Sequence, residues 1–329
     1  MSHSAIDTHG FFRRQAAWRW PEALFWLALV AAYFIFPGNL VLISRILVLG
    51  LFALSLDLIL GYGGIVSLGH AAFFGMGAYA AGLLSAHGWS EPLSGLLVAA
   101  AAAGLLGLAT SFVVVRLHGI ALLMVTMGIA LVLHEIAQKA RDITGGDDGL
   151  QGIAVAPILG LFRFDLYGHT GFWYSLIVAF LCFLVARRIV HSPFGLTLQA
   201  LRENTRRLPA IGVSVGRASA TIYTIAAMLA GIAGGLLMQT TQQVSVEVLA
   251  FERSAEVLVM LILGGAGRLY GGLIGAAVFL VLRDRFADLS PQYWYFWIGL
   301  ILVAVVLFAR NGLLGAFDAI MRRLRRSPS

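Results

Sequence analysis

Apolar runs without charged residues recur along this chain from Trp20 to Phe308, separated by short polar or glycine-rich segments. A helix needs about 20 apolar residues to cross a lipid bilayer. The pattern predicts ten transmembrane helices, at residues 23–36, 40–60, 68–86, 93–115, 120–137, 172–186, 218–239, 255–263, 272–282 and 293–309. The eighth and ninth runs are short, so we expect those helices to be tilted, broken or extended by neighbouring glycines.

This pattern predicts an all-α, polytopic helical membrane protein with one membrane domain. We assign residues 1–22 to a cytoplasmic N-terminal tail, residues 23–310 to the transmembrane domain and residues 311–329 to a basic cytoplasmic C-terminal tail. The first apolar run leads directly into a second one, so it does not have the form of a cleaved signal peptide. The longest polar stretch between the spans is the loop at residues 187–217.

Composition agrees with this class and narrows the chemistry. The residues are 60% hydrophobic and 12% charged, and the single cysteine, Cys182, excludes a disulfide or a cysteine metal cluster within the chain. The sequence also lacks a phosphate-binding P-loop, a His-Glu-x-x-His zinc motif, a Gly-x-Ser-x-Gly elbow and a dinucleotide-binding fingerprint. We therefore expect no catalytic site, no metal and no cofactor in this chain.

The distribution of Lys and Arg predicts the orientation. Lys and Arg residues are about twice as numerous in the segments on the side of the two tails and the loop at residues 187–217 as in the segments on the opposite side of the membrane. This distribution places both termini in the cytoplasm. The net charge of +7 is explained by contact with anionic lipid head groups and acidic partner surfaces. Nucleic acid is not required.

The polar loop at residues 187–217 is rich in arginine and holds a single glutamate, Glu203. Apolar residues at helical spacing run through it, namely Leu196, Ala200, Leu201, Ala210 and Ile211, which predicts an amphipathic helix on the cytoplasmic side. Pro209 interrupts this pattern, because proline inside a helix costs about 3 kcal/mol. We expect the helix to end near Arg207 and a second one to begin at Pro209.

Small residues recur in the segment that follows the first glycine-rich turn. They allow another helix to approach closely, so the segment lines either a helix-packing seam or a transport path. The residues we single out are Ser67, Gly69, His70, Phe73, Gly75, Gly77 and Tyr79. His70 has either a direct substrate or proton role, or a structural role at the turn. A second glycine-rich turn, at residues 264–272, echoes the first at residues 61–69 and is a weak sign of an internal repeat.

Four charged residues are candidates for docking an external partner: Asp147, Asp148, Glu252 and Arg253. The glycines around the paired aspartates predict a tight turn, and the calcium-loop spacing is missing. Arg253 is close enough in sequence to pair with Glu256 on one helical turn. Two further acids, Asp57 and Glu135, are either members of a polar network within the membrane or solvated groups.

Four segments together resemble one known family: SLGHAAFFGMGAYAA at residues 67–81, TGGDDGLQGI at 144–153, SPFGLTLQALREN at 192–204, and the glycine turn at 264–272. Their order is similar to that in the inner-membrane permease subunits of branched-chain amino acid ABC importers of the LivM type, over roughly residues 40–314. The resemblance implies a type II-like ABC importer permease in a bacterial inner membrane. Its partners would be a second related permease, as a heterodimer, two cytoplasmic ATP-binding subunits that hold ATP and Mg, and a periplasmic substrate-binding protein.

The resemblance also implies a coupling helix that docks on an ATPase, at residues 198–212. The positions carried over to this chain are Leu198, Ala200, Leu201, Arg202, Glu203, Asn204, Arg206 and Gly212. Pro209 departs from the family pattern and puts the exact docking surface in question.

Three alternatives stay open. Relatives in this family carry urea, short amides or other amino and aromatic acids, so the cargo is not decided by these motifs. An ion-coupled secondary transporter would need acids within the membrane, for which Asp57 and Glu135 are candidates. A membrane-embedded enzyme would need clustered histidines, but His70, His118 and His134 are expected at different depths.

Overall fold

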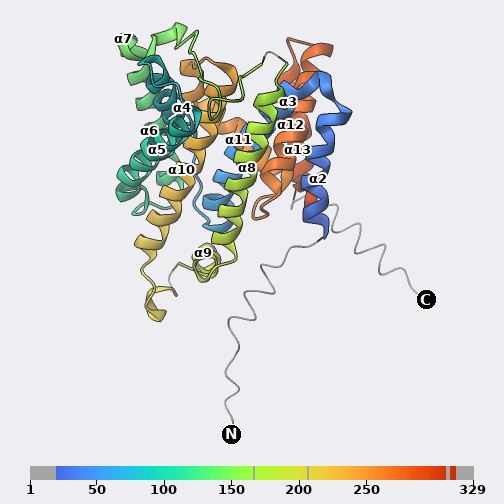
Figure 1. Ribbon diagram of the computed structural model, residues 1–329. Coiled ribbons are helices and arrows are strands. Elements are labelled where there is room, and N and C mark those ends of the chain that lie inside the picture. Colours follow the sequence, from blue (N-terminus) through green and yellow to red (C-terminus); the bar gives the residue numbers. More distant parts are fainter. Residues whose placement is uncertain (1–19, 166, 206, 309–311, 316–329) are drawn as a thin grey trace, which may run out of the picture.

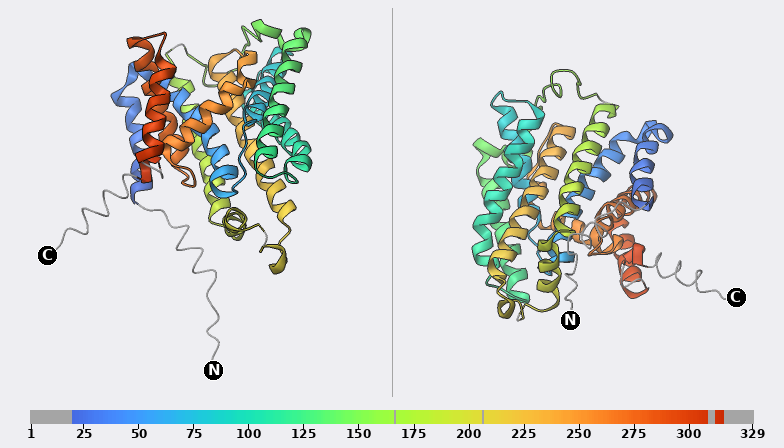
Figure 2. Two further views of the ribbon diagram at one scale, coloured as in Figure 1. Left: turned by 180° about the vertical axis from the view of Figure 1, so that it is seen from behind. Right: turned by 60° about the horizontal axis from the view of Figure 1, so that its bottom comes forward.

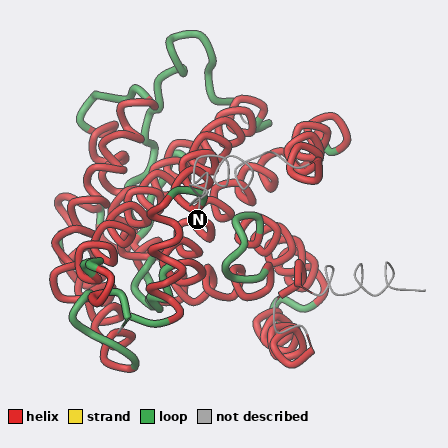
Figure 3. The backbone as a smooth tube through the Cα atoms, turned by 90° about the horizontal axis from the view of Figure 1, so that it is seen from below, coloured by secondary structure: helices red, strands yellow, loops and turns green. Residues whose placement is uncertain are grey.

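The computed structural model describes residues 20–165, 167–205, 207–308 and 312–315. Most of the two predicted tails lies outside this part of the chain. The first described helix begins at Trp20, so residues 20–22 of the predicted N-terminal tail are helical, and the bounds of the tail stay a prediction. The described residues form helices, with isolated bridges between Leu150 and Val244 and between Ile158 and Phe162 in place of strands (Figure 3).

The α-helices follow one another along the chain in the order shown in Figure 1. They are α2 (Trp20–Ile35), α3 (Leu40–Asp57), α4 (Ala71–Ala86), α5 (Pro92–Val114), α6 (Ile120–Lys139), α7 (Arg141–Thr144), α8 (His169–Val190), α9 (Pro193–Glu203), α10 (Val215–Thr241), α11 (Phe251–Gly264), α12 (Gly271–Leu289) and α13 (Trp294–Phe308). Apart from α7 and α9, each coincides with one of the ten predicted spans, which confirms a polytopic helical membrane protein.

Length and composition separate these helices into classes. Five segments are long and apolar enough to cross a bilayer: α3 with its flanking turns, α5, α6, α8 and α10. Helices α2, α4 and α13 contain shorter apolar stretches. The predicted short spans at residues 255–263 and 272–282 are longer in the structure, as α11 and α12, and a glycine-rich turn separates them. The helices are therefore extended, mainly by residues 251–254 and 283–289 and by only one glycine each, Gly264 and Gly271, rather than by the glycine-rich turn as predicted.

Helix α3 lies in the middle of the fold and α6 at its edge. In the most apolar part of each helix, 78% of the residues are buried for α3 but only 22% for α6. Figures 1 and 2 show α2 and α13 on one side of the fold, apart from each other, and α5 and α6 on the opposite side. A helix that is apolar and yet exposed faces lipid or another protein chain.

Glycines allow α10 to pack closely against α4 and α5. A Cβ atom at Gly77 in α4 would lie 2.2 Å from the carbonyl oxygen of Gly231, and one at Gly234 would lie 1.8 Å from that of Phe74. Side chains of any size are excluded at these points, so the helix backbones are in direct contact. We call this contact the glycine seam.

One predicted span is helical over only part of its length. Helix α4 begins at Ala71 rather than near Leu68, and the chain before it is irregular. The Leu68 N–H donates to Thr126 Oγ1 of α6 at 3.2 Å, and the Ala71 N–H donates to Ser254 Oγ of α11 at 2.9 Å. Irregular backbone is tolerated within a membrane when protein groups satisfy it in this way.

The two ends of the molecule carry different elements. Helix α9 lies at one end, together with the start of α2, and α7 lies at the other (Figure 1). At the α9 end, α3 continues as a π-helical turn, Leu58–Tyr62. At the α7 end, the 3-10 turns Gly146–Asp148 and Val246–Leu249 lie close to one another.

Candidate functional site

Helix α9 begins and ends at residues that its sequence explains. The Ser192 side chain accepts a hydrogen bond from the Gly195 N–H at 3.4 Å, and Pro193 occupies the first helical position. Leu198 and Leu201 are buried against the membrane domain, whereas Arg202 and Glu203 are exposed. The predicted amphipathic helix is therefore present, with Glu203 on its exposed face, but Leu196 is also exposed, so its assignment to the apolar face was wrong.

The far end of α9 differs from the prediction. The helix ends at Glu203 rather than near Arg207, because Asn204 adopts an extended conformation with φ of −158°. The predicted second helix is a single 3-10 turn, Pro209–Ile211, which Gly212 closes with φ of +80°. Ala210 and Ile211 are exposed, so their assignment to the apolar face was wrong. Arg206 lies outside the described residues.

Arg202 connects α9 to the rest of the fold. Its Nη1 donates to the carbonyl oxygen of Gly61 at 2.5 Å, across 141 residues of sequence. Gly64, with φ of +70°, passes so close that a Cβ atom there would lie 3.0 Å from the Arg202 Cα. The first glycine-rich turn thus wraps around the base of this side chain.

The second glycine-rich turn meets the first at the same place. The Gly267 N–H donates to Asp57 Oδ1 at 2.6 Å, and a Cβ atom at Gly61 would lie 2.4 Å from the Gly267 nitrogen. Arg202 is also within electrostatic range of Asp57. We call this set of contacts between Asp57, Gly61, Arg202 and Gly267 the α9 junction. It brings together the two turns that echoed one another in the sequence.

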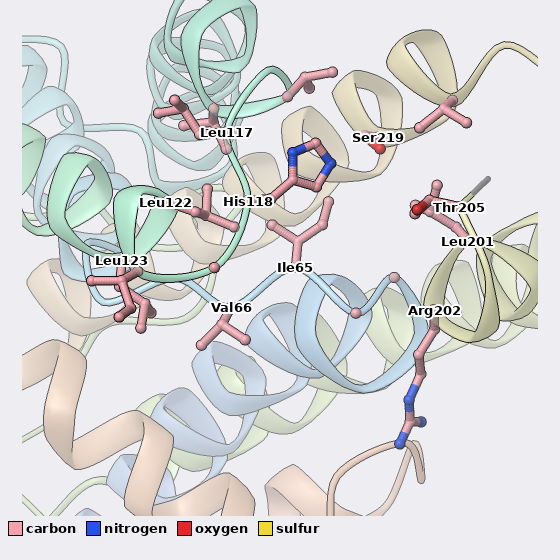
Figure 4. Close-up of a pocket in the computed structure, with 17 residues that line it drawn as sticks. Ile65, Val66, Leu117, His118, Leu122, Leu123, Leu201, Arg202, Thr205 and Ser219 are labelled. Atoms are coloured by element: carbon pink, nitrogen blue, oxygen red, sulfur yellow. The ribbon is translucent and has the colours of Figure 1, made fainter.

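A cavity of about 490 Å³ adjoins the α9 junction. Its walls come from the linker before α4, the turn between α5 and α6, helix α9 and the start of α10 (Figure 4). His118 and Ile65 point into the same space, and Arg202 extends from α9 toward the turn between α11 and α12. Little in the sequence indicates this cavity. Gly119 marks the turn between α5 and α6, where its φ is +62°.

His70 is fully buried in the interior between α3 and α4. Its Nε2 lies 2.8 Å from Ser55 Oγ, and its ring stacks on Phe52 with centroids 5.4 Å apart. The side chain does not cap α4, because it turns to Ser55 instead. Its surroundings are those of a packed side chain with one polar partner.

The other residues of the small-residue segment also have identifiable neighbours. Gly69 packs against the Thr126 carbonyl group and Gly75 against Leu249. Phe73 is buried edge-on to Tyr223, with ring centroids 5.3 Å apart. Ser67 Oγ accepts from the Gly69 N–H, and Gly77 lies in the glycine seam. Tyr79 is buried, and its hydroxyl has no hydrogen-bond partner among the described residues.

At the α7 end, two small recesses bring charged residues together. One, of about 250 Å³, is lined by residues that include Arg45, Asp148, Glu247 and Arg253. The other, of about 240 Å³, is lined by Glu247, Ala250, Glu252, Arg253 and Glu256. We call them the outer recesses. The predicted pairing of Arg253 with Glu256 is confirmed at 2.7 Å.

The remaining predicted acids are at the surface. Asp147 and Asp148 form the predicted tight turn, in which Gly145, Gly146 and Gly149 all have positive φ. Asp147 accepts from Gln138 Nε2 at 2.7 Å, and Glu135 pairs with Lys139 at 3.0 Å on an exposed face of α6. Sequence analysis missed Arg45, although a single arginine inside an apolar run was a usable signal. Among the described residues, no group of His, Cys, Asp or Glu is arranged to hold a metal ion.

Comparison with known proteins agrees with this architecture. The family described as "Branched-chain amino acid transport system / permease component" matches residues 40–306. The chain is 29% identical to the high-affinity branched-chain amino acid transport system permease protein LivM of Escherichia coli, over 89% of this chain and 73% of that protein. No solved structure matches the chain.

Two further similarities cover less than half of this chain. One is to the probable branched-chain amino acid transport permease protein LivM of Methanocaldococcus jannaschii, with 29% identity over 41% of this chain and 39% of that protein. The other is to the ribose import permease protein RbsC of Bacillus subtilis, with 27% identity over 47% of this chain and 52% of that protein. With the family match covering most of the helices, this chain belongs to the branched-chain amino acid transport system permease family and is a multi-pass inner-membrane permease subunit of an ABC importer.

Proposed function

We propose that this chain carries branched-chain amino acids across the inner membrane, driven by ATP hydrolysis on partner subunits. The complete importer would contain a second, related permease, two ATP-binding subunits on the cytoplasmic side and a periplasmic binding protein. The support for the cargo is the similarity to proteins named LivM, which extends over 89% of this chain in the E. coli relative. ATP and Mg would bind the partner subunits.

The observation that carries the proposal is the form of α9. It is short and amphipathic, it lies at one end of the membrane domain, and its exposed face is charged (Figure 1). Such a helix fits a groove on a partner protein, with buried leucines anchoring it to its own chain. We assign the α9 end to the cytoplasm, since the arginine-rich loop is there.

The α9 junction supplies a mechanical route from the ATPase into the membrane. Arg202 binds the carbonyl group of Gly61, which follows α3, and Gly61 packs against Gly267, which follows α11. Movement of α9 is thereby passed to the ends of two membrane helices at once. Switching of interfaces between packed helices is a common basis for such transitions. Alternating access would follow from closure of the ATPases.

The opposite end suits the binding protein. Asp147, Asp148 and Glu252 are exposed there, and we assign them, with Arg253, to docking of the binding protein. The elements that line the cavity near α9 and those that line the outer recesses lie at opposite ends of the molecule (Figure 1), as expected for the exit and entry of a path.

A second candidate cargo class is favoured by one observation. The similarity to a ribose import permease indicates that this scaffold is shared with importers of non-amino-acid substrates. Urea, short amides and other amino or aromatic acids therefore remain candidate cargoes. An ion-coupled secondary transporter has less support, because Asp57 is bonded to the backbone of Gly267 and Glu135 is exposed and paired.

The test is uptake of labelled leucine into proteoliposomes that hold this chain with its partner permease and ATPases. The binding protein is added outside, and wild type is compared with Glu203→Lys on α9. The matched control is Glu135→Lys, a charge reversal at the other end of the molecule. We expect uptake to require ATP and to fall only in Glu203→Lys, with the complex still assembled.

Two results would contradict the proposal. Leucine uptake without ATP would contradict an ABC importer and favour an ion-coupled transporter. ATP-dependent uptake of urea or another solute, with no binding or uptake of leucine, would contradict the cargo and leave the class intact.

A further inference from the structure

Charged residues gather in and around the outer recesses. Arg45 of α3 lies within electrostatic range of charged residues from α11 and α12. These residues are Arg253, Glu256, Arg283 and Asp284. Three arginines and two acids therefore gather where three helices meet at the α7 end.

The positive charges of this cluster are unevenly neutralised. Arg253 pairs with Glu256 at 2.7 Å, and Arg283 lies 3.3 Å from Asp284. Arg45 is exposed and takes part in no hydrogen bond or ion pair found among the described residues, and the Arg253 Nε is buried without an acceptor. The recess thus offers one unpaired guanidinium and one unused N–H, which together match a carboxylate.

The position of Arg45 argues that it faces water or a polar molecule. It lies five residues beyond Leu40, the first residue of α3, which is a membrane-spanning helix. A charged side chain in lipid costs about 3 kcal/mol or more and therefore normally faces a water-filled space or another polar group. The first outer recess, of about 250 Å³, is that space, because Arg45 forms part of its wall.

The two outer recesses share residues of opposite charge. Glu247 and Arg253 line both of them, so an acid and a base face the same space. The first recess also has apolar walls, formed by Leu150, Leu237, Val244 and Val248. A molecule that carries a carboxylate, an ammonium and an apolar side chain fits this arrangement.

We propose that the outer recesses form an entry site for the zwitterionic head of an α-amino acid. Arg45 and Arg253 bind the carboxylate, and Glu247 accepts hydrogen bonds from the ammonium group. The apolar walls receive the side chain. This inference rests on the proposed function and extends it, since it identifies a ligand site within this chain and gives Arg253 a role in binding the substrate rather than the external protein.

The start of α11 supports the same assignment. Helix α11 begins at Phe251, so Arg253 lies in its first turn, where the helix dipole favours a negative ligand. The helix is also short, at 14 residues, and begins inside the fold next to the start of α4. Half-length helices of this kind hold the substrate in other transporters.

The test uses a leucine analogue with a photoreactive diazirine on its side chain, delivered by the binding protein to the reconstituted importer. Three variants of this chain are compared with wild type: Arg45→Gln, Arg45→Lys and, as matched control, Arg285→Gln. Arg285 is an exposed arginine on α12 that does not line either recess. Maximal uptake rate, the KM for the loaded binding protein, cross-linking and complex assembly are measured.

We expect maximal uptake to fall about tenfold in Arg45→Gln, as for loss of one charged contact worth about 1.4 kcal/mol. The KM for the loaded binding protein stays near that of wild type, Arg45→Lys recovers most of the rate, and Arg285→Gln has no effect. Cross-links map to Leu237 or Val248 in wild type and weaken in Arg45→Gln.

Three outcomes would overturn the inference alone. Unchanged uptake in Arg45→Gln would show that Arg45 does not bind the substrate carboxylate. A raised KM with an unchanged maximal rate would show that Arg45 docks the binding protein. Loss of assembly in both Arg45 variants, but not in Arg285→Gln, would show an interface with the second permease. Wild type that imports no amino acid would instead overturn the proposed function, and this inference with it.

Discussion

The glycine seam and the α9 junction hold their helices together in opposite ways. In the seam, Gly77 faces Gly231 and Gly234 faces Phe74 with backbone atoms in direct contact and no polar side chain between them. In the junction, Arg202 and Asp57 each bind the backbone of a distant turn. The seam therefore depends on shape, and the junction depends on a small number of hydrogen bonds.

The difference indicates which part of the molecule moves. Close-packed interiors resist any change of volume, and their contacts are lost together. A hydrogen bond contributes about 1 kcal/mol, or about 1.5–3 kcal/mol when one partner is charged, and it can break and re-form alone. We therefore expect α4, α5 and α10 to move as one body while α9 and the two glycine turns shift against it.

The largest effect should come from filling the glycine seam. In Gly234→Val the new side chain meets the Phe74 carbonyl oxygen, which a Cβ atom would approach to 1.8 Å. Overpacking against backbone should cost about 3 kcal/mol or more, seen as a lower unfolding temperature in detergent and poor yield. Gly216→Ala is the control on the same helix, because a Cβ atom there lies 3.6 Å from Val115 Cγ1. Equal stability of the two variants would contradict a shape-dependent seam.

Removing the charged contact of the α9 junction should affect transport more than folding. In Arg202→Met the Gly61 carbonyl group loses its donor, which costs about 1.5–3 kcal/mol at most. We expect ATP-dependent uptake to fall about tenfold, with ATP hydrolysis retained and no longer stimulated by the loaded binding protein. Arg207→Met, an exposed arginine beyond α9, should behave as wild type. If the loaded binding protein still stimulates ATP hydrolysis in Arg202→Met, the α9 junction does not couple the ATPases to the membrane helices.

The two polar members of the junction should act as a unit. Asp57→Asn keeps the oxygen that accepts from the Gly267 N–H but removes the negative charge near Arg202. Alone it should lower uptake less than Arg202→Met does. Residues in one network show coupling of about 0.5–3 kcal/mol in double-mutant cycles. Additive losses of uptake in the double variant would mean that the two contacts work independently.

The smallest effect concerns the start of α5, far from the junction. The Glu91 side chain accepts from the Ser94 N–H at 2.7 Å, and this hydrogen bond lowers the pKa of Glu91 below its ordinary value of 4.5. A lowered pKa gives stability that is present above the ordinary value and is lost as pH falls through the folded-state value.

Glu91→Gln should therefore lower the unfolding temperature slightly at pH 7, by less than about 1 kcal/mol in stability. The difference from wild type should shrink as pH falls below 4.5, and uptake at pH 7 should not change. A difference that persists at low pH would mean that the carboxylate charge is not what stabilises the helix.

Properties of single helices could be predicted from the sequence. The apolar runs located ten of the described helices, of which five are long and apolar enough to span a bilayer, and Ser192 followed by Pro193 explains where α9 begins. The turn around Asp147 and Asp148 was also recognisable from its glycines. In each case the residues that decide the structure are neighbours in the chain.

Contacts between distant segments could not be predicted in this way. Asp57 and Gly267 are 210 residues apart, and no period along the chain connects them. Pro209 suggested a break after Arg207, but the break came at Asn204, whose extended backbone ends α9 first. Arg45 was not singled out from the sequence, because its charged neighbours Arg253 and Arg283 come from α11 and α12, more than 200 residues away.

The contact between Arg202 and Gly61 has a consequence for how such importers diversify. Arg202 binds a main-chain oxygen, which every amino acid possesses, so the turn can change many of its side chains and keep this bond. The backbone path through Gly61, Gly64 and Gly267 cannot change in the same way, because neighbouring segments approach these glycines too closely to leave room for a side chain. Gene duplicates could then acquire new cargoes in their outer halves while remaining compatible with the same ATPases.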